Sequence, residues 1–94
     1  MGEHTPGPWK RSEKTDGNWW HIGAGNQAVA AVHAASKKHN EPYASMFEAN
    51  ANLIAAAPEL LSALEFVLSA HGEQLDTAFA QAQEAITKAK GGKA

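Results

Sequence analysis

Five histidines are the side chains of this sequence best suited to metal or acid–base chemistry. They are spread along the chain, at His4, His21, His33, His39 and His71. No two of them stand four residues apart, the helical spacing that lets two imidazoles share a zinc ion, and the chain has no cysteine. We therefore predict no metal site and no cofactor. Because no nucleophile and base converge in the sequence either, we predict that the protein is not an enzyme.

A glycine-rich stretch permits two interpretations. Residues 23–28, GAGNQA, fit the Gly-x-Gly-x-x-Ala pattern of a dinucleotide site, in which a helix N-terminus holds the pyrophosphate. The same residues can form the turn of a β-hairpin. The following segment 36–44 is polar and contains Pro42, so it cannot be the second buried strand that a dinucleotide fold requires. We predict the hairpin, with a helix over 26–35 as the alternative.

Two adjacent tryptophans suggest a binding surface. Neighbouring residues of a strand point to opposite faces, so if Trp20 and Ile22 face the core, Trp19 and His21 share the other face. Trp19 is then either a structural cover or a platform on which a base or a partner side chain stacks. Basic and imidazole groups from nearby segments complete this candidate ligand site, with His33 expected opposite His21 and phosphates met by Arg11, Lys37 or Lys38.

The elements that would position these side chains begin with three short strands. The segment HTPGPW at 4–9 excludes helix, because proline lacks the backbone donor. Strands are predicted over 9–13, 19–22 and 27–33, joined by the turn cluster at 15–18 and the glycine turn near residue 25. In the third strand, Val29 and Val32 should lie on opposite faces.

The helical part is predicted from Ser45 onwards. Ser45 and Glu48 have capping-box spacing, and apolar residues then recur every three or four positions. Pro58 predicts a kink or break, and a second helix is expected over 73–89, ended by two glycines. The predicted fold class is α+β: an antiparallel sheet of about three strands packed on a long Pro-kinked helix and a C-terminal helix. Residues 1–90 form one domain and residues 91–94 a disordered tail.

Composition and hydropathy limit the classes of partner that we expect for this chain. The 94 residues are 44% hydrophobic and 19% charged, with a formal net charge of −2, and no predicted helix has a basic face, so we expect no DNA binding. We expect no membrane association, because no apolar run reaches the roughly 18–20 residues of a span. The apolar face of the long helix exceeds what the small sheet and second helix can cover. This predicts a homo-oligomer with an interface at Phe47, Ile54, Leu61 and Leu68.

Two segments resemble a known group of proteins. The start HTPGPW and the stretch NANLIAAAPELLSAL at 50–64 are similar to small proteins of tailed phages and prophages. The resemblance implies a phage origin and transfers no functional residue. We expect a non-enzymatic binding protein of the host cytoplasm that opposes a bacterial defence system, by sequestering a nucleotide signal or by binding a defence protein. The alternative is a passive accessory protein that partners a phage replication or packaging component.

Overall fold

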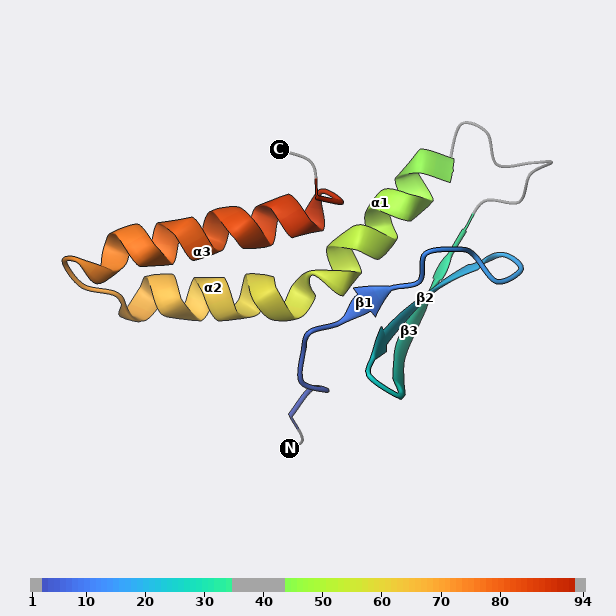
Figure 1. The fold of residues 1–94 in the computed structure, drawn as a ribbon, viewed down its shortest axis with the longest axis horizontal. Helices are drawn as coiled ribbons and strands as arrows, with labels where there is room; N and C mark the ends of the chain where they lie inside the picture. Colours follow the sequence, from blue (N-terminus) through green and yellow to red (C-terminus); the bar gives the residue numbers. More distant parts are fainter. Residues whose placement is uncertain (1–2, 35–43, 93–94) are drawn as a thin grey trace.

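The computed structural model describes residues 3–34 and 44–92 of the chain. Three strands are followed by three helices, which confirms the predicted α+β class (Figure 1). The sheet and the first helix lie at one end of the molecule, and the other two helices form a pair that extends away from it. The elements are β1 (Lys10–Arg11), β2 (Trp19–Ala24), β3 (Gln27–His33), α1 (Ala44–Ala55), α2 (Ala57–Ser69) and α3 (Gln74–Ala89).

The sheet is antiparallel, in the order β1-β2-β3, and glycines make both of its tight turns. Gly17 has φ +62° before β2, and Gly25 has φ +59° between β2 and β3. Residues 27–33 are a strand, so the hairpin prediction is confirmed. The dinucleotide interpretation is wrong, because no helix N-terminus follows these glycines to hold a pyrophosphate.

A β-bulge changes which side chains of β3 face inward. Ile22 lies opposite Ala30 and Gly23 opposite Ala28, which leaves Val29 as an extra residue between them. Val29 and Val32 both pack on the core around Ile22. The prediction that these two valines lie on opposite faces is therefore wrong, because the bulge interrupts the alternation of side chains.

The core is built mainly from small side chains. Ile22, 1% exposed, packs against Ala51 and Ala55 of α1, with Trp9, Trp20 and Ile54 among the partly buried residues around them. Among the described residues, the buried apolar side chains are Ile22, Pro58 and seven alanines. Eight large apolar side chains are instead exposed. The helices can therefore approach the sheet and one another closely, but Ile22 is the one large apolar side chain among the described residues that is fully buried besides Pro58.

The long predicted helix is interrupted at Ala56. The axes of α1 and α2 differ by 52°, and Pro58 lies in the first turn of α2, where a missing N–H is tolerated. The N-terminal segment crosses here, since a Cβ atom on Gly7 would lie 2.8 Å from the Cβ of Pro58. Ser45 is inside α1 and is not the predicted N-cap, because the helix begins at Ala44.

A helix that crosses a membrane must be long and apolar, which none of the described helices is by itself. Only α1 and α2 taken together meet that requirement of length and composition, as a bent pair.

The last helix returns alongside α2 and ends at two glycines, as predicted. Gly92 N–H donates to the carbonyl of Thr87, and Gly91 N–H donates to that of Lys88. With φ values of +82° and +83°, the glycines form a Schellman cap that satisfies the terminal carbonyls of α3.

The left-handed conformation of Gly25 generates a prediction. Replacing Gly25 with Val should destabilise the protein by at least about 1–2 kcal/mol, because a β-branched residue resists positive φ. The melting temperature should fall by roughly 4–8 °C per kcal/mol in a domain of this size. Gly25→Asn is the matched control, since Asn tolerates this conformation. Equal melting temperatures for the two variants would contradict the hairpin turn.

Candidate functional site

An aromatic row crosses the junction between the sheet and α1. Trp19, 46% exposed, pairs across the strands with His33, and their ring centroids are 5.6 Å apart at 77°. His33 in turn meets Phe47 of α1, at 5.0 Å and 69°. Both contacts have the edge-to-face geometry that aromatic rings prefer. The exposed Trp19 ring of β2 is therefore held in place by His33 of β3, which is itself held by Phe47 of α1.

The row borders a groove between β3 and α1 with a volume of about 440 Å³. Such a volume is within the usual range of ligand pockets. His33 and Asn50 are its polar side chains, and Leu53, 53% exposed, stands at its surface. We call it the aromatic groove, and its lining residues are Ala31, Val32, His33, Phe47, Asn50, Leu53 and Ile54. This lining suits an apolar group that carries a hydrogen-bonding atom.

The two histidines of the predicted site do not face each other. His33 lies opposite Trp19, whereas Ala31 lies opposite His21, so the expected pairing of His21 with His33 is wrong. The His21 ring instead points to the first turn, with Nε2 3.5 Å from Asp16 Oδ2. Trp19 and His21 do share the exposed face of β2, as predicted, while Trp20 and Ile22 face the core.

Arg11 lies on the inner face of the sheet. It is paired with Ile22, and its guanidinium is 4.3 Å from the centre of the Trp20 ring and 3.1 Å from Glu48 of α1. These contacts tie the sheet to α1 and direct Arg11 away from Trp19. The other predicted phosphate-binding residues, Lys37 and Lys38, lie outside the described residues.

The predicted oligomer interface is divided between two surfaces. Phe47 and Ile54 line the aromatic groove. Leu61 and Leu68 lie beyond the bend, on α2, with 45% and 86% of their surface exposed. The structure thus joins one half of the predicted interface to the predicted ligand residue His33 and leaves the other half apart.

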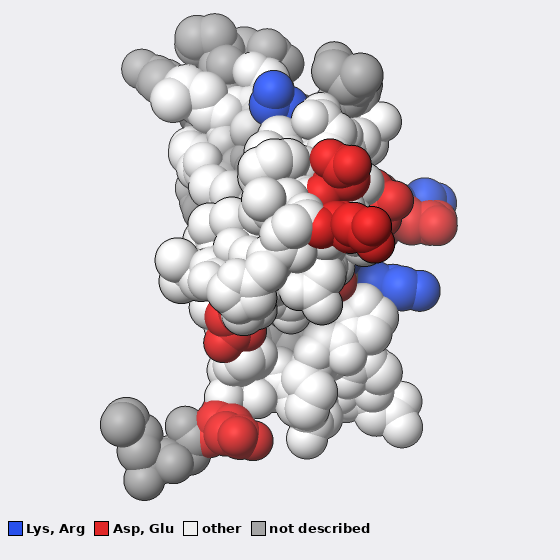
Figure 2. Space-filling model, turned by 90° about the vertical axis from the view of Figure 1, so that its left-hand side faces the viewer, with Lys and Arg blue, Asp and Glu red and all other residues white. Residues whose placement is uncertain are grey.

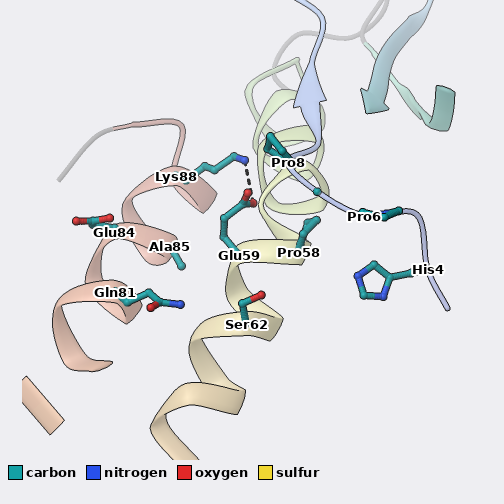
Figure 3. A pocket seen from close by; sticks show the side chains of 11 residues that line it. His4, Pro6, Pro8, Pro58, Glu59, Ser62, Gln81, Glu84, Ala85 and Lys88 are labelled. Carbon is teal, nitrogen blue, oxygen red and sulfur yellow. Dashed lines mark hydrogen bonds and ion pairs between the residues drawn. The ribbon is translucent and has the colours of Figure 1, made fainter. Parts of the chain in front are cut away.

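A second cavity, of about 620 Å³, lies between the N-terminal segment and the α2–α3 pair (Figure 3). Its polar groups hold the fold together. Lys88 Nζ donates to Glu59 Oε1 at 2.8 Å and to the carbonyl of Trp9 at 3.1 Å. Trp9 Nε1 donates back to the carbonyl of Thr5 at 2.9 Å. Sequence reasoning missed this clamp, because nothing in the pattern joins Lys88 to residues so distant along the chain.

Metal-ligating side chains do not cluster in the described part of the chain. Within residues 3–34 and 44–92, no group of three or more His, Asp or Glu side chains is arranged to hold a metal ion. The aromatic groove is a candidate binding site, because its lining combines exposed apolar surface with two hydrogen-bonding side chains.

Comparisons with known proteins agree with the predicted origin. The family model described as Salmonella phage P22 protein Y8K6 matches residues 1–93, nearly the whole chain. No curated protein and no solved structure matches. The prediction of a phage origin is thereby confirmed.

The two roles of Arg11 can be tested by truncation. Arg11→Ala should lower the stability by about 1 kcal/mol, because an exposed ion pair contributes roughly 0.2–1 kcal/mol and an exposed cation–π contact roughly 0.5–1 kcal/mol. Lys10→Ala is the control, since the neighbouring Lys10 side chain is exposed. Thermal unfolding of both variants measures the effect, and an Arg11→Ala protein as stable as Lys10→Ala would refute the anchoring role.

Proposed function

Because this chain belongs to the Salmonella phage P22 protein Y8K6 family, we propose that it is a phage-encoded binding protein that engages another protein through the aromatic groove. The observation that carries this proposal is an apolar groove that opens beside the exposed, firmly held Trp19. Binding is its whole activity, and it needs no catalytic group of its own.

The chemistry of the groove favours a protein over a nucleotide. A phosphate is bound by guanidinium or ammonium groups or by free backbone donors at a helix N-terminus. Among the described residues, the groove lining has no lysine or arginine, and Arg11 is engaged with Glu48 and Trp20 on the inner face. An apolar side chain of a protein partner can pack against Phe47, Leu53 and Ile54, and the polar backbone of that partner can hydrogen-bond to His33 and Asn50.

The position of β3 suggests the form of the bound segment. β3 is an edge strand, and no strand among the described residues pairs with its outer side. Three consecutive residues of β3, 31–33, also line the groove. An extended segment of the partner can therefore add to the edge through backbone hydrogen bonds and place alternate side chains in the groove.

A host defence protein is the partner class that we propose. A phage protein can neutralise such a target by covering a functional surface, which requires an interface and no reaction. The phage family and the exposed groove support this role. If the partner is instead a replication or packaging component of the phage, loss of binding will harm the phage in every host, which an infection experiment detects.

The prediction concerns a phage that carries Leu53→Asp in this gene. Leu53 is half exposed, so the variant should fold, but a carboxylate would be buried at the interface with the partner. The efficiency of plating should fall more than about tenfold on a strain with the targeted defence system. Each 1.4 kcal/mol of lost binding free energy raises the dissociation constant for the partner tenfold. Plating on a strain without the system should not change.

The control places the same charge elsewhere on α1. Ser45→Asp is exposed and does not line the groove, so its phage should plate like the wild type. If Leu53→Asp plates normally across a panel of single-defence strains, the groove is not the binding site. A loss on undefended hosts would assign the protein an accessory role. Recovery of a stoichiometric nucleotide from heat-denatured protein of infected cells, by mass spectrometry, would overturn protein binding.

A further inference from the structure

The α2–α3 pair carries five large apolar side chains that are exposed to solvent. Leu61, Leu64 and Leu68 of α2 are 45%, 64% and 86% exposed. Phe79 and Ile86 of α3 are 57% and 43% exposed. We call these five residues the helix-pair face. A cluster of this size is unusual on the surface of a monomer, whereas singly exposed apolar residues are common.

Helical geometry puts these residues on one side of the pair. On α3, Ala78 and Ala85 face α2, and Phe79 and Ile86 each follow one position later, so they project to one flank of this seam. The cavity of Figure 3, with Gln81 and Lys88, is on the other flank. On α2, Ser62 borders that same cavity, and Leu64 projects to the flank away from it. Leu61 and Leu68 continue the row at the outer side of α2.

Charge follows the same division. The cavity flank holds Glu59, Glu84 and Lys88. On the other flank the charged side chains border the helix-pair face: Glu65 lies between Leu61 and Leu68, and Asp76 and Lys90 lie at the two ends of the row of Phe79 and Ile86. In the view onto the end of the molecule near the α2–α3 turn, most charged side chains lie to the right, and much of the left is uncharged (Figure 2). One flank of the pair is thus suited to water, and the other to an apolar surface.

The shape of the chain indicates that a layer is missing. A compact domain of 94 residues has a radius of gyration of about 12 Å, whereas this chain has 15.3 Å and extents of 53 × 32 × 20 Å. Domains usually bury an apolar core between two layers of secondary structure. The α2–α3 pair is a single layer in which the fully buried side chains are alanines and Pro58, and five of its larger apolar residues point outward.

We propose that a second copy of this chain covers the helix-pair face, so that two α2–α3 pairs form a four-helix bundle. A mainly apolar surface is compatible with its own copy about a two-fold axis, because its bordering charged side chains, Glu65, Asp76 and Lys90, are exposed and can stay in water at the rim of the interface. The helices are about 20 and 24 Å long, and a pair is about 20 Å wide, which gives a flat footprint of roughly 400 Å² per copy. Protruding side chains enlarge this area, so the total approaches the about 1,000 Å² of a specific interface.

The test is the mass of the full chain in solution. Light scattering after size exclusion should give about 20 kDa, twice the 10.0 kDa of one chain. Leu64→Asp and Phe79→Asp should each give the monomer mass. Leu68→Asp provides a third variant that keeps the fold, because Leu68 is 86% exposed and makes few contacts within its own chain. Ser62→Asp, on the opposite flank of α2, is the matched control and should remain a dimer.

Several outcomes would overturn the proposal. The first is a wild-type mass of about 10 kDa at protein concentrations up to about 100 μM, since a weak complex would form at that concentration. The second is a dimer that persists in all three aspartate variants. The third is binding of the monomer through this face to phosphatidylcholine–phosphatidylglycerol vesicles. Circular dichroism must show unchanged helix content in the variants. The proposal does not rest on the proposed function, since Leu53→Asp should abolish partner binding and leave the dimer mass unchanged.

Discussion

The packing of Ile22 against Ala51 and Ala55 is the contact on which the rest of this structure depends. Two alanines on one side of α1 let the helix lie close to a sheet of only three strands, because the helix contributes only methyl groups at this contact. That closeness brings Glu48 within 3.1 Å of Arg11 and sets the Phe47 ring against His33. The sheet, whose first strand has only two residues, is thereby attached to the helices.

The use of alanine at the contacts has a consequence for the surface. The seam between α2 and α3 also contains alanines, at Ala63, Ala78 and Ala85, while five Leu, Phe and Ile side chains of these helices project outward. In most domains such residues would form the core. Here they form exposed surfaces, which supports the proposed binding function.

The bend of 52° at Ala56 separates these surfaces. On the side of α1, aromatic rings and the edge strand β3 make a groove suited to one segment of a partner. Beyond the bend, the α2–α3 pair presents a broader face suited to another layer of helices. The clamp from Lys88 to Glu59 and to the Trp9 carbonyl joins the N-terminal segment to both helices of the pair, so the two halves are held at a defined angle.

The sequence by itself determined the features that depend on neighbouring residues. Glycines at 17 and 25 supply positive φ, Pro58 lacks a backbone donor near the helix break, and apolar spacing distinguishes strand from helix. Only the tertiary structure decided which distant side chains meet. The bulge turned Val29 inward, the strand register put His33 opposite Trp19, and the approach of α1 engaged Arg11 with Glu48, 37 residues away. Such contacts depend on the relative position of whole elements, and no local pattern in the chain encodes that position.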